Sequence, residues 1–239
     1  MTAIRENLEK LEEAITAACR AASRPRGEVE LMAVSKLHPA SMLIEAAALG
    51  LTLFGENRVQ EFAAKSVELG SSRQTMSCHL IGHLQSNKAS RAVEIFDAVD
   101  SLDSLRLAER LNEAAGKCNK RLPVLIEVKL SPEETKAGLL PGSDEAAQLL
   151  ERLPDLAHLE TRGLMTIAPW GAPDAVTRAC FRTLRAWRDR WAQAYPALDL
   201  GVLSMGMSGD FALAIAEGAT RIRVGTALFG KRAPQPEQL

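Results

Sequence analysis

Hydrophobic and polar residues follow two different periods along this chain. Near its start, Ile4, Leu8, Leu11 and Ile15 recur at the spacing of an amphipathic helix, which we predict over about residues 3–22. Farther on, short apolar runs typical of strands alternate with segments of helical period. The predicted strands are 30–35, 51–54, 79–81, 96–99, 124–130, 159–167, 202–205 and 221–229. The predicted helices between them are 40–49, 58–69, 86–95, 104–117, 143–152, 174–195 and 209–217.

This alternation determines the predicted fold. Strands that alternate with helices form a parallel sheet, because each helix carries the chain back to the start of the next strand. Eight such units in 239 residues favour a closed (β/α)8 TIM barrel over an open doubly wound sheet, which would leave two edges unpaired. No linker or low-complexity segment interrupts the pattern, so we predict one α/β domain over residues 1–239.

The composition gives no sign of a polyanionic partner. Lys and Arg total 29 against 30 for Asp and Glu, so no excess positive charge is present to bind nucleic acid or an anionic membrane. Arg178, Arg182 and Arg185 share a face of the predicted helix 174–195, and we interpret that face as solvated. We expect a monomer that contacts neither nucleic acid nor membrane.

The cysteines and the N-terminus indicate the compartment. The N-terminal residues lack the continuous apolar stretch of a signal peptide, and no apolar run reaches the length that spans a membrane. The cysteines are widely separated and form no C-x-x-C pair, which favours a reduced, cytoplasmic protein. They are Cys19, Cys78, Cys118 and Cys180.

Two glycine turns resemble an anion-binding cradle. Gly206, Ser208 and Gly209 precede a predicted short helix that Asp210 is expected to cap, and Gly225-Thr226 follows the last strand. In (β/α)8 barrels, function lies at the carboxyl ends of the strands, and phosphate most often binds after strands seven and eight. Both turns fall at those two positions.

Lys36 ends the first strand. Alternation along a strand places Met32, Val34 and Lys36 on one face, and an inward face would bring the lysine to the barrel mouth. A partly desolvated amine there can attack a carbonyl, whereas the alternative is an ordinary surface lysine. An amine that faces a phosphate site suits pyridoxal 5′-phosphate (PLP), and a phosphorylated sugar also fits.

Arg223 distinguishes between these two ligands. If it points inward, it lies at the height of a bound pyridine ring and donates to the ring nitrogen, which then stays unprotonated. Arg221 shares its strand face and needs a carboxylate partner, for which we expect Glu127 on the fifth strand.

Six motifs in order along the chain resemble the pyridoxal phosphate homeostasis proteins. The resemblance implies a single-domain, fold-type III PLP barrel similar to the N-terminal domain of alanine racemase, without its C-terminal β domain and without established catalytic turnover. The motifs are Ala-Val-Ser-Lys at 33–36, Phe-Gly-Glu-Asn at 54–57, His-Leu-Ile-Gly-His-Leu-Gln-Ser-Asn-Lys at 79–88, Gly-Leu-Met-Thr at 163–166, Ser-Met-Gly-Met-Ser at 204–208 and Arg-Val-Gly-Thr-Ala at 223–227.

The resemblance also implies a set of cofactor contacts. Lys36 would form the internal aldimine, and Asn57 would lie near the ring. The implied role of the protein is storage and delivery of PLP to apo-enzymes, with protection from free aldehyde. The remaining implied contacts are Arg223 at the ring nitrogen and Ser208, Gly225 and Thr226 at the phosphate.

Three residues near this site depart from the family pattern, and two other polar residues are further candidates for it. Arg58, Cys78 and Lys129 replace the tyrosine, tryptophan and asparagine that are frequent there, which affects the rim of the pocket more than the cofactor. Lys129 and Lys136 could offer a secondary amine for handing on the aldehyde, although solvated lysines are the alternative. His83, past a glycine turn, is interpreted as a pocket residue.

Two enzymatic alternatives stay open, a weak PLP-dependent racemase and a Schiff-base aldolase acting on a sugar phosphate. Racemisation needs a second base opposite the lysine, and Tyr195, the one tyrosine, falls at a helix end. His79 and His83 are four residues apart but span a strand end and a turn, so we expect no metal site.

Overall fold

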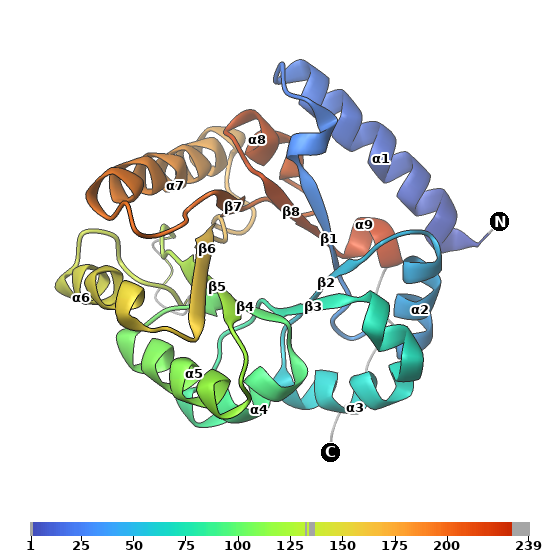
Figure 1. Ribbon diagram of the computed structural model, residues 1–239. Helices are drawn as coiled ribbons and strands as arrows, with labels where there is room; N and C mark the ends of the chain where they lie inside the picture. The colour runs from blue at the N-terminus through green and yellow to red at the C-terminus, as the bar shows by residue number, and fades with distance from the viewer. Residues whose placement is uncertain (1, 132, 134–136, 231–239) are drawn as a thin grey trace.

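A computed structural model describes residues 2–131, 133 and 137–230. Eight parallel strands close into a barrel, in which the last strand pairs with the first, and helices surround the barrel (Figure 1). The strands are β1 (Glu30–Val34), β2 (Leu53–Glu56), β3 (Ser77–Leu80), β4 (Ala98–Leu102), β5 (Leu122–Glu127), β6 (Leu159–Met165), β7 (Val202–Ser204) and β8 (Arg221–Val224). The α-helices are α1 (Ala3–Ala21), α2 (Ala40–Ala48), α3 (Val59–Leu69), α4 (Ala89–Ile95), α5 (Leu105–Lys117), α6 (Asp144–Arg152), α7 (Asp174–Ala194), α8 (Phe211–Ala216) and α9 (Thr226–Phe229).

The predicted (β/α)8 barrel is confirmed, and the bounds of several elements differ from the prediction. The strand predicted over 221–229 ends at Val224, because the backbone turns at Gly225 and the next four residues form α9. The fourth strand lies about three residues later than predicted, so that Asp100 and Ser101 are inside β4 and not after it. The helix predicted over 86–95 begins as a 3-10 turn, Ser86–Lys88, before α4.

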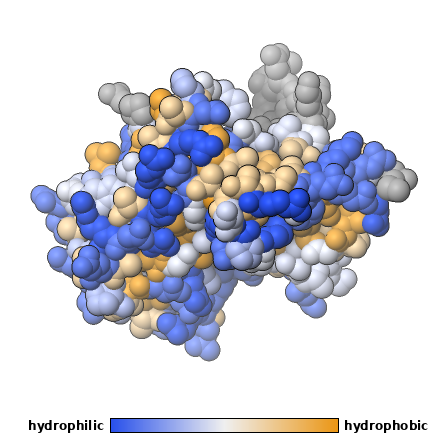
Figure 2. Space-filling view, turned by 90° about the horizontal axis from the view of Figure 1, so that it is seen from above, coloured by the Kyte–Doolittle hydropathy of each residue, from blue (hydrophilic) through white to orange (hydrophobic). Residues whose placement is uncertain are grey.

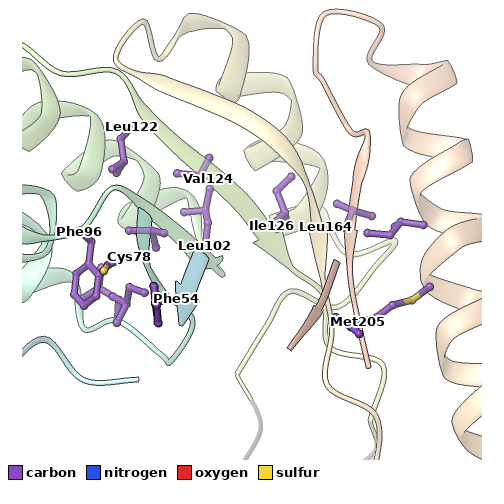
Figure 3. Close-up of a cluster of buried hydrophobic side chains, with 14 of the residues drawn as sticks. Phe54, Cys78, Phe96, Leu102, Leu122, Val124, Ile126, Leu164 and Met205 are labelled. Atoms are coloured by element: carbon purple, nitrogen blue, oxygen red, sulfur yellow. The ribbon is translucent and has the colours of Figure 1, made fainter. Parts of the chain in front are cut away.

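The main hydrophobic core lies between the barrel and the helices. On β1, Leu31 and Ala33 belong to this cluster. The rings of Phe62 on α3 and Phe96 before β4 stack at 4.6 Å. Figure 3 shows Phe96 close to the side chains of neighbouring strands in the same cluster, among them Phe54. Burial of such side chains stabilises the fold by about 1.5–3 kcal/mol each, so the core fixes the strands that carry the site.

Helix α1 covers the junction between the last and first β/α units. It buries Ile4, Leu11 and Ile15 and lies against α8 and α9 (Figure 1). Nδ2 of Asn7 donates a 2.9 Å hydrogen bond to the carbonyl of Leu228 in α9. The N-terminal helix therefore supports the segment that follows β8.

The arginine face of α7 contacts the end of α8. Arg178 and Arg182 form ion pairs with Glu217 at 3.6 and 3.1 Å, and Nη1 of Arg185 donates to the carbonyl of the same residue. The side chains of Arg178 and Arg182 are still 42% and 64% exposed. The expected solvated face is therefore partly a helix–helix contact.

Hydrophilic residues dominate the side of the molecule seen in Figure 2, with hydrophobic residues in small groups between them. Within the described ranges, the helices are too short or too polar for any of them to cross a bilayer. None of the four cysteines is in a disulfide, and three of them are buried.

Candidate functional site

Lys36 lies two residues beyond the end of β1, at the carboxyl end of the barrel. Val34 and Lys36 line a cavity at the barrel mouth, as strand alternation predicts. Met32, on the same strand face, is fully buried, and a Cβ built at Gly55 on β2 would lie 2.8 Å from its Sδ. The neighbouring strand therefore needs glycine beside Met32.

Ser35, the residue before Lys36, is fixed by hydrogen bonds to β2 and α3. Ser35 is buried, and its Oγ donates a 2.7 Å hydrogen bond to Oε1 of Glu56 at the end of β2. Nζ of Lys65 on α3 donates to the Ser35 carbonyl at 3.0 Å and forms a 2.5 Å ion pair with Glu56. Burial raises the pKa of Glu56, and Lys65 opposes that increase.

The residue after Lys36 is also fixed by α3. Leu37 has a φ of +64°, in the left-handed region that residues with a Cβ seldom adopt. Its N–H donates a 2.6 Å hydrogen bond to Oε1 of Glu61. Contacts on both sides of Lys36 therefore determine where its side chain leaves the backbone.

The cavity has a volume of about 650 Å³ and is open at the barrel mouth. Its size lies in the range of about 300–1,000 Å³ that is common for small-molecule sites. Val34, Ile81 and Ile167 give it apolar walls, and Trp170, 87% exposed, lines its rim. Six of the seven residues predicted for the site line it, namely Lys36, Asn57, Ser208, Arg223, Gly225 and Thr226.

The first glycine turn follows β7. Gly206 has a φ of +93°, and a Cβ there would lie 2.5 Å from Cβ of Ala214, so the position requires glycine. Asp210 does not cap α8 as expected, because its Oδ1 turns back and accepts a 2.5 Å hydrogen bond from the N–H of Met207. The turn is thus closed on itself, with Ser208 at its tip facing the cavity.

The second turn follows β8. A Cβ at Gly225 would lie 3.1 Å from the carbonyl oxygen of Val34, so a larger residue would press on β1 close to Lys36. The N–H of Ala227 donates a 3.4 Å hydrogen bond to Oγ of Ser208, which connects the two turns. Thr226 and Ser208 therefore border the same side of the cavity.

Arg223 is almost fully buried beneath the cavity. Its Nη1 donates to Oγ of Ser204 at 2.9 Å, and its Nη2 donates to the carbonyl of Thr166 at 2.8 Å. Burial lowers the pKa of Arg223, and the carboxylates of Asp100 and Glu127 oppose this. These contacts fix the plane of the guanidinium. Sequence reasoning did not predict Ser204 and Thr166 as its partners, although both stand at strand ends.

The expected pair of Arg221 with Glu127 is wrong. Arg221 instead pairs with Glu30 at 2.7 Å and with Asp100 at 3.2 Å. Glu30 faces Arg221 directly in the register of β1 and β8, at the amino end of the barrel. Glu127 ends β5 at the opposite end of the barrel, so it is one strand length away.

His79 belongs to the same buried polar group as Asp100 and Arg221. Its Nδ1 lies 2.9 Å from Oδ1 of Asp100, and its Nε2 lies 3.1 Å from Oγ of Ser77. Burial alone would raise the pKa of Asp100, but His79, Arg221 and Arg223 together lower it. The histidine therefore belongs to a buried network below the cavity.

His83 does not line the larger cavity with the other six predicted residues. Its side chain is 58% exposed and pairs with Asp103 at 2.9 Å. It lines a smaller cavity of about 180 Å³ together with Glu127 and Lys129. The two cavities share Asn57, Ile81 and Ile167 as walls. Lys136 lies outside the described residues.

Comparison with known proteins places the chain among PLP-related barrels. The family profile described as alanine racemase, N-terminal domain, matches residues 2–233. The pyridoxal phosphate homeostasis proteins of Pasteurella multocida and Pseudomonas aeruginosa are 39% and 41% identical to it. These matches cover 96% and 97% of this chain and 97% of each relative. The structure of PipY from Synechococcus elongatus with PLP bound is 45% identical, with a TM-score of 0.84, and covers 95% of this chain and all of PipY.

More distant structures share the barrel. The alanine racemase of Clostridium difficile is 17% identical, with a TM-score of 0.71. The match covers 95% of this chain but 56% of the racemase. The likeness therefore concerns the fold alone.

Proposed function

The chain belongs to the pyridoxal phosphate homeostasis protein family, and from this membership we propose that it binds PLP covalently through Nζ of Lys36 and serves intracellular PLP homeostasis. The observation that carries the proposal is that Lys36, Ser208 and Thr226 line one cavity. An amine and two hydroxyl donors on the same cavity suit a ligand with an aldehyde at one end and a phosphate at the other.

The residues of the cavity fit the cofactor. When bound, PLP supplies an aldehyde that an amine can attack, a pyridine ring and a phosphate. The apolar walls formed by Val34, Ile81 and Ile167 suit the ring, and Asn57, which lines the same cavity, would lie beside it. Gly225 has no side chain, which leaves the backbone there open to where the phosphate would lie.

Arg223 would set the electronic character of the ring. A guanidinium donates hydrogen bonds and does not accept them, so at the ring nitrogen it keeps that nitrogen unprotonated. Its contacts with Ser204 and Thr166 hold it in a fixed plane. A cofactor held in this way stabilises a carbanion poorly, which suits a carrier better than a carbanion-forming enzyme.

A racemase is the second candidate, and the cavity argues against it. Inversion at a stereocentre needs a second base on the face opposite the lysine. Tyr195 stands at the C-terminal end of α7 and not among the residues that line the cavity. We therefore propose a carrier that stores PLP, shields its aldehyde and delivers it to apo-enzymes.

The proposal extends to the compartment, the oligomeric state and the partners of the protein. We take the protein as a monomer of the cytoplasm, where thiols stay reduced, since none of its four cysteines is in a disulfide. The net charge of −1 favours neither nucleic acid nor anionic membranes as partners. Recipient enzymes would approach at the barrel mouth, where Trp170 is exposed.

The test is covalent capture of the cofactor. Wild-type protein reconstituted with PLP should be yellow, and borohydride reduction should leave the pyridoxyl group on the peptide that contains Lys36, as mass spectrometry would show. Lys36→Ala should remain colourless, whereas the exposed-lysine control Lys117→Ala should match the wild type. A colourless wild-type protein, or an adduct that survives in Lys36→Ala, would contradict the proposal.

Two further assays separate the alternatives. A racemase would exchange the α-hydrogen of D- or L-alanine with deuterated solvent, and we expect no exchange above that of free PLP. A Schiff-base aldolase would cleave a sugar phosphate without any yellow cofactor. Transfer of the cofactor is followed by mixing PLP-loaded protein that has not been treated with borohydride with an apo-enzyme. Recovery of that enzyme's activity is then measured.

A further inference from the structure

The smaller cavity beside the proposed cofactor site contains a buried carboxylate. Glu127, the last residue of β5, lines this cavity and is only 6% exposed. Among the described residues, nothing forms a hydrogen bond with its Oε2. A buried carboxylate oxygen without a donor is costly, by about 1–3 kcal/mol or more. Glu127 lines the cavity, so a cationic ligand there can compensate the charge of this carboxylate.

Several charged groups face Glu127 from neighbouring elements. Asp103 after β4 adds negative charge, while Arg223 on β8 and His83 after β3 add positive charge. Lys129, two residues farther along the chain, lines the same cavity. Burial, the largest cause, and the charge of Asp103 together raise the pKa of Glu127 to about 7, against the opposing effect of Arg223 and His83. Both the protonated and the ionised form are therefore accessible near neutral pH.

The size of the cavity restricts its ligand. It has a volume of about 180 Å³, and a cavity of about 150 Å³ accommodates a benzene ring. It therefore takes a chain of a few heavy atoms and not a second copy of the cofactor. Asn57, Ile81 and Ile167 separate it from the cavity that contains Lys36 and line both.

We propose that this cavity binds a primary ammonium group on a short aliphatic chain, with Glu127 as the carboxylate that receives it. An ammonium has three N–H donors and no acceptor, so it supplies the carboxylate with hydrogen-bond donors and a compensating charge. The inference rests on the proposed function, because this cavity borders the one that contains Lys36 and the aldehyde of the proposed cofactor reacts with amines. The chain can come from a free amine or from a lysine side chain of a recipient protein.

The binding test uses Lys36→Ala protein without cofactor, so that no covalent adduct forms. Butylammonium and an Nα-acetyl-lysine amide, which represent the two sources, are titrated into it and followed by ¹H–¹⁵N NMR. Either probe should bind, and its affinity should fall at least tenfold in Lys36→Ala/Glu127→Gln. The double variant Lys36→Ala/Glu113→Gln, altered on the exposed face of α5, should keep the affinity of Lys36→Ala.

A second readout is the pH dependence of binding. Affinity for butylammonium should rise between pH 6 and 8, as Glu127 loses its proton, and n-butanol should not compete. Equal affinities with and without the Glu127 carboxylate, or no binding of either probe, would overturn the site. Wild-type protein is reconstituted with PLP in parallel. A colourless wild type would refute the proposed function alone, whereas the amine site is judged in protein that holds no cofactor.

Discussion

The backbone N–H of Leu37 donates a 2.6 Å hydrogen bond to Oε1 of Glu61, which fixes the residue after Lys36 to helix α3. Leu37 has a φ of +64°, a conformation that costs roughly 1–2 kcal/mol for a residue with a Cβ. The carboxylate therefore stabilises a backbone conformation that leucine does not favour. The direction in which Lys36 leaves the strand depends on that conformation.

Replacing Glu61 with alanine should weaken both the fold and the cofactor site. We expect the free energy of unfolding to fall by about 1 kcal/mol, the usual net contribution of one hydrogen bond, because this bond lies at the exposed surface. PLP affinity, measured by titration of the yellow adduct, should fall several-fold because Lys36 is less well positioned. Glu68→Ala, on the exposed side of the same helix, serves as the control. Unchanged PLP affinity in Glu61→Ala would show that Leu37 needs no anchor.

The buried pair of Lys65 and Glu56 behind Lys36 should respond strongly to loss of one partner. Both side chains are buried, at 6% and 0% exposure. Lys65→Met would leave the carboxylate without its cation, at a cost of about 3–5 kcal/mol in unfolding free energy. Lys65→Met/Glu56→Gln should recover much of this loss, as urea denaturation would show. Additive losses in the double variant would mean that the two residues act independently.

The order of strands and helices was predictable because the barrel repeats one local pattern. The segment at 226–229 was misassigned as strand, since Ala-Leu-Phe is apolar enough for either state. The backbone turn at Gly225 and the contact of α9 with α1 decide its conformation. Neither can be inferred from periodicity within the segment.

The residues that line the cavity were predictable only where they lie at or directly after the carboxyl end of a strand. The position of Lys36 and Thr226 at the barrel-mouth cavity was predictable because each follows a strand, and strand ends of a barrel converge. Contacts set by register across the barrel were not found, such as Arg221 with Glu30. The role of Glu61 depends on how α3 packs against the first strand, so no spacing in the sequence could indicate it.

Asp100 should contribute stability that depends on pH in the acidic range. Its pKa is lowered, since His79, Arg221 and Arg223 together outweigh the effect of burial. A lowered carboxyl pKa means that the stabilisation is present above the ordinary value near 3.8 and is lost as the pH falls below it.

Asp100→Asn should therefore cost about 3 kcal/mol at pH 7, because it leaves buried cationic groups with less compensation. The difference from wild type should shrink below pH 4, where the wild-type carboxyl takes up a proton. Urea denaturation across this range measures it, with the exposed Asp155→Asn as the control. A difference that stays constant with pH would contradict the assigned charge of Asp100.

Glu127 should have the opposite effect on stability. Burial, the largest cause, raises its pKa from 4.5 to about 7, so the folded protein holds this proton more tightly than the unfolded chain does. Stability from this group is full below the unfolded pKa and is lost as the pH rises through the folded pKa. One pKa unit corresponds to about 1.4 kcal/mol, so the loss between pH 4.5 and 7 can reach about 3 kcal/mol.

Glu127→Gln removes the titration and keeps the shape of the side chain. The variant should unfold at higher urea concentration than wild type at pH 8, by up to about 3 kcal/mol, and should differ little from it at pH 5. Adding butylammonium should stabilise wild type at pH 8 and leave the variant unaffected, because only the carboxylate pairs with an ammonium. Parallel stability curves for the two proteins would show that Glu127 is ionised throughout this range and finds its compensating charge within the chain.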